Sequence, residues 1–367
     1  MKVAVLGFGT VGQGVYEMLH HACGLEAGPV LVRAGKDDAA FKVTTIDAIT
    51  GDPAVDAVVE VLGGIEPARS WVEQALKAKK HVVTANKALV AAHGPELAAL
   101  AREQGVAFLF SAACGGGVPF LHNLSIATLD DEIESLGGIL NGTTNFMLDS
   151  MQSEGMDYAE ALSIAQKLGY AEADPTADVE GIDACRKICI LSSLAFGRHV
   201  YPEYVHAEGI SKLTAADVEM AAKEDRVIKL LGITRRYEDG TVFAMVAPFA
   251  ISRNHLLAGV EDVFNGIVVK GNAVDEVAFV GRGAGKLPTA SAVVADIIDC
   301  VKHRGGENMM KWADCKENIV RNWEEERFSR LVRVAGEAEH RVTEPMTEAE
   351  FAAAFSGKTV ESAVRML

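Results

Sequence analysis

The chain has 367 residues, of which 49% are hydrophobic and 23% charged, and its formal net charge is −16 at pH 7. This length allows two domains with separate cores, while the excess of acids argues against nucleic acid or an anionic membrane as a partner. No apolar run approaches the roughly 20 residues of a membrane span, and a glycine motif interrupts any signal-peptide core at the N-terminus. We therefore expect a cytoplasmic protein.

The first 130 residues alternate short apolar runs with helical patterns. Strands are predicted at residues 1–6, 29–34, 57–62, 81–85 and 106–112. Helices are predicted between them, up to about residue 20, over 67–79 and up to about 104. Apolar strands that alternate with helices predict an α/β fold with a doubly wound parallel sheet.

The rest of the chain has mixed patterning. Predicted elements are a strand over 135–140, a mainly helical segment to about 200, a helix over 214–223, and strands over 242–251 and 266–280. The order of these elements therefore predicts an α+β domain over residues 131–285. A further helix is predicted over 288–302, and the tail of residues 305–367 is charged, weakly patterned and unassigned.

The sequence GFGTVG at residues 7–12 lies between a predicted strand and a predicted helix, which is the context of the dinucleotide-binding fingerprint. Gly7 permits the tight turn, Gly9 lets the backbone approach a pyrophosphate, and Gly12 lets helix and strand pack closely. Free N–H groups where the helix begins, at Thr10 and Val11, favour a phosphate. A purely structural glycine turn is the alternative interpretation.

The second predicted strand ends without the acid that binds the ribose 2′-hydroxyl of NAD. Arg33 and Lys36 follow it instead, and cations in this place suit a 2′-phosphate. NADP is therefore favoured over NAD, with two solvated surface cations as the alternative.

Three turns that follow predicted strands are further candidates, because ligands bind at the carboxyl ends of parallel strands. Lys87 follows the strand over 81–85, and an ordinary surface lysine is its alternative. The glycines of 114–119, CGGGVP, expose backbone groups to a ligand or an ion. The turn 141–144, NGTT, offers N–H groups to a substrate carboxylate. Either glycine-containing turn also fits a tight connection.

The segment 169–187, GYAEADPTADVEGIDACRK, places five carboxylates before a lysine that opens an apolar helix. The acids are Glu172, Asp174, Asp178, Glu180 and Asp183. Asp183 lies one helical turn before Lys187, so it can hold the lysine ammonium. Burial disfavours the ammonium form and the carboxylate favours it, a balance that suits proton transfer. An ordinary salt bridge at the start of a helix is the alternative.

Taken in order, these motifs resemble those of the homoserine dehydrogenases over roughly residues 1–300. The resemblance is carried by GFGTVG, VEVLGGIEPAR, HVVTANKALVA, CGGGVPFL, LNGTTNFML, GYAEADPTADVEGIDACRK and GRGAGKLPTASAVVADI. That family interconverts L-homoserine and L-aspartate 4-semialdehyde with NAD(P), in threonine, methionine and isoleucine biosynthesis. The resemblance implies a Rossmann-type domain at 1–130, completed by a returning helix at 286–304, and a catalytic and dimerisation domain at 131–285.

The resemblance also implies roles for single residues. Lys187 matches the catalytic lysine that moves the hydroxyl proton, and Asp183 would position it. The residues that would hold the substrate are Glu172, Asp178, Gly142, Thr143 and Lys87. The residues that would bind the cofactor are Gly7, Gly9, Thr10, Val11, Gly12, Arg33, Lys36, Thr84, Lys87 and Gly285.

Two regions depart from the family pattern. Members often have Glu where this chain has Ser111, next to a loop whose carbonyls bind a monovalent cation such as sodium. Here those carbonyls belong to Cys114, Gly116 and Val118. The tail has room for only part of the ACT regulatory domain, with a first strand at 328–334, so we expect weak or absent feedback by threonine. Like the family, the chain is expected to form homodimers through the sheet of its second domain.

Two rival functions remain open. One is a cofactor-binding sensor without catalysis, although the lysines and acids of the site are all present. The other is a dehydrogenase with a cysteine nucleophile, which needs an activated thiol with a base partner. Neither Cys114 nor Cys185 has a histidine close in sequence. The six cysteines also lack the spacing of a zinc site, so reduced thiols that pack as small hydrophobic groups are expected.

Overall fold

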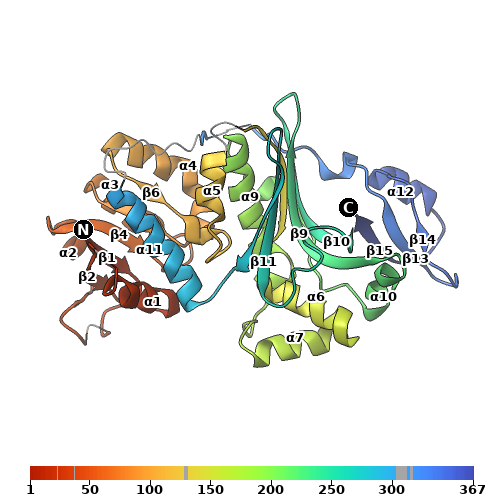
Figure 1. The fold of residues 1–367 in the computed structure, drawn as a ribbon, viewed down its shortest axis with the longest axis horizontal. Coiled ribbons are helices and arrows are strands. Elements are labelled where there is room, and N and C mark those ends of the chain that lie inside the picture. The colour runs from red at the N-terminus through yellow and green to blue at the C-terminus, as the bar shows by residue number, and fades with distance from the viewer. Residues whose placement is uncertain (23, 37, 128–130, 303–311, 315–316) are drawn as a thin grey trace. The chain divides into compact units, whose positions relative to one another are not determined.

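The computed structural model describes all residues except 23, 37, 128–130, 303–311 and 315–316. The chain forms two compact units (Figure 1). Unit 1 comprises Met1–Asp130, Ser193–Tyr201 and Gly281–Lys316, and unit 2 comprises Asp131–Ser192, Pro202–Val280 and Glu317–Leu367. Among the described helices, none is long and apolar enough to cross a membrane.

Unit 1 contains a six-stranded sheet in the order β3-β2-β1-β4-β5-β6, and every pair of neighbours is parallel. Its strands are β1 (Lys2–Leu6), β2 (Glu26–Leu31), β3 (Lys42–Val43), β4 (Val55–Glu60), β5 (His81–Thr84) and β6 (Phe108–Leu109). The order reverses direction between β1 and β4, where doubly wound sheets bind their ligands. The predicted doubly wound fold is therefore confirmed.

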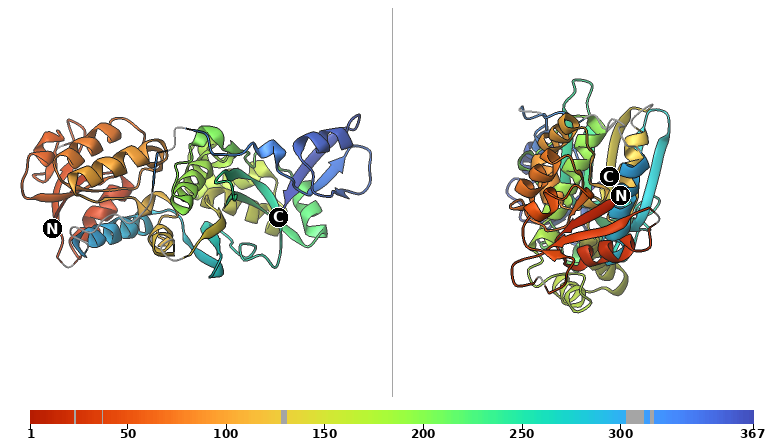
Figure 2. Two further views of the ribbon diagram at one scale, coloured as in Figure 1. Left: turned by 90° about the horizontal axis from the view of Figure 1, so that it is seen from above. Right: turned by 90° about the vertical axis from the view of Figure 1, so that its left-hand side faces the viewer.

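Helices cover both faces of this sheet, as the view from above in Figure 2 shows. They are α1 (Thr10–Leu19), α2 (Asp47–Thr50), α3 (Ala68–Lys77), α4 (Lys87–Gln104), α5 (Phe120–Ala127) and α11 (Lys286–Lys302), with a short 3₁₀ helix η1 (Ser111–Ala113). Helix α11 comes from far along the chain, yet Ala290, Val293 and Ile297 share one buried core with Val15 and Leu19 of α1. Burial of this apolar face fixes α1, and with it the glycine turn that precedes α1.

Unit 2 contains a nine-stranded mixed sheet in the order β12-β11-β7-β9-β10-β15-β13-β14, with β8 also paired to β10. Its strands are β7 (Ile133–Ile139), β8 (His206–Ala207), β9 (Arg226–Arg236), β10 (Val242–Ser252), β11 (Phe264–Gly271), β12 (Asp275–Arg282), β13 (Arg330–Val334), β14 (Arg341–Val342) and β15 (Val360–Met366). Its helices are α6 (Gly142–Glu154), α7 (Tyr158–Lys167), α8 (Thr176–Val179), α9 (Ile182–Phe196), α10 (Ala215–Lys223) and α12 (Glu348–Ala354), with 3₁₀ turns η2 (Pro202–Tyr204) and η3 (Trp323–Glu325). This unit has the predicted α+β class.

Three element predictions in unit 2 differ from the structure. The strand predicted over 266–280 is two strands, because the Asp131 carboxylate accepts hydrogen bonds from the N–H groups of Ala273 and Val274 and holds a turn between β11 and β12. Strand β9, which pairs with β10 along eleven residues, was missed. The C-terminal tail, which the sequence left unassigned, contains regular strands: β13 pairs with β15, and β15 pairs with β10 and so extends the sheet.

Candidate active site

Lys187 and Asp183 form a buried ion pair on α9. Lys187 is 7% exposed and Asp183 is 4% exposed, and the Lys187 Nζ lies 2.6 Å from the Asp183 Oδ2. The same Nζ donates a second hydrogen bond of 2.6 Å to the backbone carbonyl of Leu140, at the end of β7. The lysine is therefore held from two elements, and the predicted i,i+4 pairing is present.

Asn141 connects this pair to a second acid. Its Nδ2 donates to Asp183 at 3.0 Å and to Asp178 at 2.7 Å. Its Oδ1 accepts from the Thr144 N–H at 2.9 Å, so Asn141 is also the N-cap of α6. The Asn141 side chain thus caps the helix and forms hydrogen bonds with two of the predicted acids. The sequence pattern predicted the turn but gave Asn141 no role; its signal was an Asn that precedes a helix directly after a strand.

The other predicted substrate residues lie on the same unit. Gly142 opens α6, and a Cβ there would lie 2.5 Å from the Val263 carbonyl oxygen, so only glycine fits. The Thr143 hydroxyl donates to the Tyr170 carbonyl at 2.7 Å, which ties the α6 start to the segment that carries Glu172. Glu172 is exposed, and within the described residues its carboxylate forms no hydrogen bond or ion pair. A cationic ligand group would therefore meet no competitor there.

In unit 1 the GFGTVG turn has the geometry that its glycines predict. Gly7 has φ of +103°, and a Cβ on Gly12 would lie 2.2 Å from the Gly7 carbonyl oxygen. Gly9 and Thr10 are exposed where α1 begins, Val11 is half-buried, and no side chain caps the helix. The first-turn N–H groups of a helix without a side-chain cap are suited to bind a phosphate group.

Two cations follow β2. Arg33 and Lys36 are exposed, and a turn joins them through a 3.0 Å hydrogen bond from the Lys36 N–H to the Arg33 carbonyl. Neither side chain takes part in an ion pair among the described residues. Both charges are thus available to an anion at the end of the second strand.

Sequence reasoning missed Glu60, the last residue of β4. It is fully buried and accepts hydrogen bonds from the Thr84 hydroxyl at 2.5 Å and from the Leu62 N–H at 2.7 Å. Burial raises the pKa of its carboxyl, and these hydrogen bonds offset only part of the effect. The carboxyl ties the ends of β4 and β5 together, so the Thr84 side chain is used inside the protein.

The residue pair after β5 continues this arrangement. Asn86 is the N-cap of α4 and donates to the Gly64 carbonyl at 2.6 Å, which fixes the loop after β4. Lys87, a predicted substrate and cofactor residue, is the first residue of α4 and is half-buried. Its backbone is thereby placed at the carboxyl edge of the sheet.

The predicted cation loop follows η1. Gly115 and Gly116 have φ of +77° and +52°, and a Cβ on Gly116 would lie 2.3 Å from the Gly283 carbonyl oxygen. Cys114 and Val118 are buried, and the Val118 carbonyl accepts from the Phe120 N–H at 2.7 Å. One of the three predicted ligand oxygens is therefore already hydrogen-bonded. Gly285, with φ of +119°, lies just before α11 on the returning chain.

The thiols have structural environments. Cys114 and Cys185 are buried, and the Cys185 Sγ lies 3.9 Å from the Pro202 carbonyl oxygen as a weak donor. Hydrogen bonding to Cys189 lowers the pKa of the Cys185 thiol, but burial leaves it out of reach of solvent. The part of the chain that the structure describes contains no group of three or more His, Cys, Asp or Glu side chains placed to hold a metal ion.

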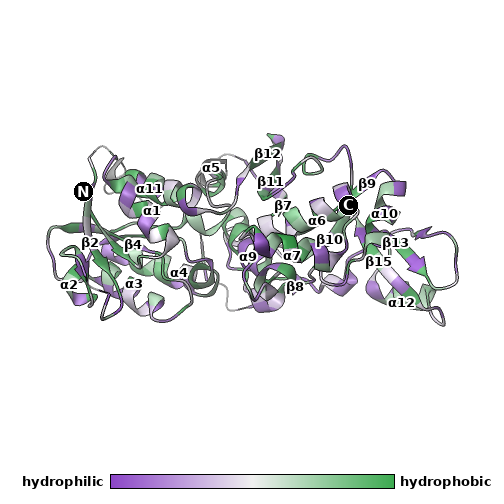
Figure 3. Ribbon diagram, turned by 90° about the horizontal axis from the view of Figure 1, so that it is seen from below, coloured by the Kyte–Doolittle hydropathy of each residue, from purple (hydrophilic) through white to green (hydrophobic). Residues whose placement is uncertain are grey.

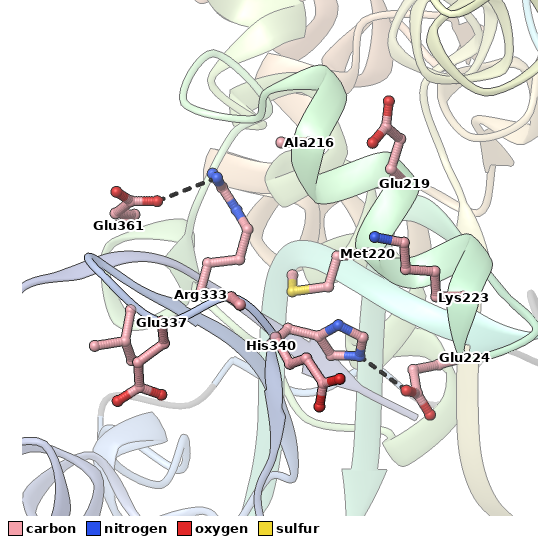
Figure 4. A pocket seen from close by; sticks show the side chains of 12 residues that line it. Ala216, Glu219, Met220, Lys223, Glu224, Arg333, Glu337, His340 and Glu361 are labelled. Carbon is pink, nitrogen blue, oxygen red and sulfur yellow. Dashed lines mark hydrogen bonds and ion pairs between the residues drawn. The ribbon is translucent and has the colours of Figure 1, made fainter.

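A cavity of about 670 Å³ lies apart from these residues, between α10 and the C-terminal strands of unit 2. Figure 4 shows Arg333 and His340 on one side and Lys223 and Glu224 on α10 and at its end. His340 and Glu224 interact across it at 2.8 Å, and Arg333 pairs with Glu361 at 3.2 Å. None of the predicted site residues lines this cavity.

Comparisons with known proteins decide the family. A model described as "Homoserine dehydrogenase" matches residues 119–298, and one described as "Homoserine dehydrogenase, NAD binding domain" matches residues 7–111. A homoserine dehydrogenase of Synechocystis is 45% identical over 317 residues, which cover 82% of this chain and 73% of that protein. The chain belongs to the homoserine dehydrogenase family. The predicted family and the predicted oxidoreductase activity are thereby confirmed.

Solved structures agree with this assignment. The structure of a homoserine dehydrogenase from Thiobacillus denitrificans has a TM-score of 0.90 and 35% identity, and the match covers 100% of this chain and 98% of that chain. A hyperthermophilic archaeal homoserine dehydrogenase, solved in complex with NADPH, has a TM-score of 0.71 and 26% identity, with 82% and 97% covered. The folds of both units are therefore those of solved homoserine dehydrogenases.

Proposed function

We propose that Lys187 is the acid and base of the homoserine dehydrogenase reaction in this chain and that Asp183 positions it. The observation that carries this proposal is the buried lysine with two fixed acceptors, Asp183 and the Leu140 carbonyl, each at 2.6 Å. A surface lysine samples many rotamers, whereas this Nζ is confined to one place. Confinement lowers the entropic cost of proton transfer to a substrate oxygen.

In the oxidative direction, Lys187 accepts the hydroxyl proton of L-homoserine as the carbon loses hydride. In the reductive direction, it donates the proton to the carbonyl oxygen of L-aspartate 4-semialdehyde. A bound nicotinamide supplies the hydride chemistry. The Asp183 carboxylate stabilises the lysine while it is charged and keeps the Nζ aimed at the reacting oxygen.

The substrate's own charges suit the remaining residues of unit 2. The exposed Glu172 carboxylate binds the α-ammonium group, and Asp178, fixed by Asn141, adds a second negative charge. The N–H groups of α6 at Gly142 and Thr143 bind the α-carboxylate. Lys87, at the edge of the unit 1 sheet, is assigned to both the substrate and the cofactor.

We further propose NADP as the preferred dinucleotide, with NAD as the other substrate of this site. The GFGTVG turn, with Gly7, Gly9, Thr10, Val11 and Gly12, binds the pyrophosphate, and Arg33 and Lys36 bind the 2′-phosphate. Support comes from the exposed, unpaired state of both cations within the described residues and from the archaeal relative solved with NADPH. Thr84 and Gly285 contribute backbone contacts, since the Thr84 hydroxyl is already bonded to Glu60.

Three further features complete the proposal. A monovalent cation binds the carbonyls of Cys114 and Gly116, with weaker participation of Val118. The chain forms a homodimer through the unit 2 sheet, since the outer strand β12, which is labelled in Figure 3, exposes Val277 and Val280 and apolar edge strands are normally covered. The protein is cytoplasmic, which fits its four described cysteines, since none of them forms a disulfide.

The deciding experiment is a spectrophotometric assay at 340 nm with L-homoserine and NADP or NAD, on wild type and Lys187→Ala. We expect the variant to lose at least about 100-fold in kcat while it binds cofactor normally. Lys77→Ala is the matched control, because Lys77 also pairs with an acid four residues away on a helix, Glu73 at 3.2 Å. An undiminished rate in Lys187→Ala would refute the proposed role. Cofactor binding without turnover in the wild type would favour the sensor.

A further inference from the structure

The Leu140 carbonyl accepts a hydrogen bond from the active-site lysine, and a second side chain donates a hydrogen bond to the same carbonyl oxygen. The Nδ2 of Asn265 donates to the Leu140 oxygen at 3.1 Å, while the Lys187 Nζ donates to the same oxygen at 2.6 Å. A carbonyl oxygen has two lone pairs, so it can accept both hydrogen bonds. Leu140 thus links Asn265, 125 residues away in sequence, to the lysine.

The sheet explains why Asn265 reaches this oxygen. Strands β11 and β7 are antiparallel with Gly266 opposite Ile139, which places Asn265 opposite Leu140 just beyond the last described pair. The Leu140 carbonyl accepts no described backbone hydrogen bond at this point, where β7 gives way to the α6 cap at Asn141. Among the described residues, the Lys187 Nζ is the other hydrogen-bond donor to this oxygen, so loss of Asn265 would leave the lysine to hold the carbonyl.

Asn265 occupies this position at an energetic cost. It is 1% exposed, and its Oδ1 has no hydrogen-bond donor among the described residues. A buried acceptor without a partner is destabilising, and an apolar side chain of the same shape would avoid the penalty. A purely structural role in the core would therefore be better served by leucine than by asparagine.

We propose that Asn265 is a positioning residue for the dehydrogenase reaction, which fixes the Leu140 carbonyl and weakens it as an acceptor for Lys187. Donation from the amide withdraws electron density from the oxygen, so the carbonyl holds the lysine ammonium less tightly than it would alone. The proposal rests on the assignment of Lys187 as the acid and base.

The charged groups around Lys187 define what the test must hold constant. Helix α9 contributes Asp183, and α8 contributes Asp178 through Asn141. The residue after β7 contributes the neutral Leu140 carbonyl, and strand β11 contributes the Asn265 amide. Replacement of Asn265 by leucine adds no charge and leaves both carboxylates in place, so a change in the pH–rate profile of that variant arises from the shared carbonyl.

The test compares Asn265→Leu with wild type in homoserine oxidation, across pH, together with thermal unfolding. We expect a midpoint of unfolding that is unchanged or higher, and a kcat reduced about tenfold because the lysine is less well placed. The KM for homoserine should change less than kcat. The acidic limb of the profile should move upward by about half a pH unit, because the freed carbonyl favours the ammonium.

Two further variants keep the outcome interpretable. Asn265→Asp, which preserves the shape and adds a carboxylate, should move the same limb upward at least as far. Asn145→Ala is the matched control, since Asn145 is equally buried and donates to the carbonyls of Val260 and Asp262 instead. This control should unfold at lower temperature with the pH profile unchanged.

The possible failures are distinguishable. If Lys187→Ala is inactive but both Asn265 variants keep the wild-type kcat and pH profile, the role of Asn265 is overturned while the lysine assignment stands. The same holds if Asn145→Ala shifts the profile as far as the Asn265 variants do. If Lys187→Ala is fully active, the underlying assignment fails first.

Discussion

Asp296 is a buried carboxyl group whose replacement should stabilise unit 1 at alkaline pH. It lies on α11, is 3% exposed, and accepts a 2.8 Å hydrogen bond from the Ser111 N–H of η1. Burial raises its pKa from 3.8 to about 7; the hydrogen bonds from Ser111 offset part of this shift, and the charge of Asp299 adds to it. Asparagine has the same shape and no charge to desolvate. We predict that Asp296→Asn unfolds at higher denaturant concentration than wild type at pH 8.

The raised pKa of Asp296 sets the direction in which stability changes with pH. An acid with a raised folded-state pKa binds its proton more tightly in the folded chain, so its contribution to stability is complete below pH 3.8 and is lost as the pH rises through about 7. A shift of this size corresponds to about 4 kcal/mol in total. Of this, about 3 kcal/mol should be lost between pH 5 and pH 8. The variant should lack this loss.

Urea unfolding at both pH values measures the effect. Trp71 and Trp312 lie in unit 1 and Trp323 in unit 2, so tryptophan emission in a Trp323→Phe background follows unit 1 alone. Asp299→Asn is the control, and it should show a smaller change of the same sign because the charge of Asp299 is the smallest of the causes that shift the pKa of Asp296. Equal pH dependence in wild type and Asp296→Asn would refute the reasoning.

Two shorter predictions concern the ion pair between Glu208 and the C-terminal strand and the binding of the cofactor. Burial alone would raise the pKa of the Glu208 carboxyl, but hydrogen bonds from His206 and Arg365 hold this pKa at about 2. Its contribution to stability is therefore lost as the pH falls from 4.5 towards 2, and Glu208→Gln should flatten acid unfolding followed by circular dichroism. Arg33→Ala with Lys36→Ala should raise the KM for NADP about tenfold and leave that for NAD within about twofold, by initial rates at 340 nm; equal effects on both would contradict a 2′-phosphate site.

Much of unit 1 could be predicted from the sequence because its information is local. Each buried parallel strand is an apolar run, and GFGTVG directly follows the first. Glu60 could not be recognised from such local patterns, since it ends the apolar strand VDAVVE and has the character of a polar strand boundary. Only the fold shows that its carboxyl faces inward to Thr84.

Unit 2 was harder to predict because its important contacts are distant in sequence. Asn141 meets Asp178 and Asp183 at separations of 37 and 42 residues. The tail is attached to the unit by Arg365, which lies 2.6 Å from Glu208 across 157 residues. Patterns of period 2 or 3.6 describe which face of an element is buried, but they carry no information about which polar groups meet there.

The Lys187–Asp183 pair has the same sequence spacing as an exposed pair elsewhere in the chain, and tertiary structure alone makes the two pairs differ. Lys77 and Glu73 have the same i,i+4 relation on α3, with a separation of 3.2 Å and side chains that are 61% and 30% exposed. The Lys187 and Asp183 side chains are 8% and 6% exposed at 2.6 Å. Water screens the first pair, so its interaction is weak, whereas burial strengthens the second and removes alternative partners for the ammonium. Both pairs can be predicted equally well from the sequence, but only the Lys187 ammonium is also held by a backbone carbonyl, that of Leu140 directly after β7, which Asn265 of β11 contacts as well.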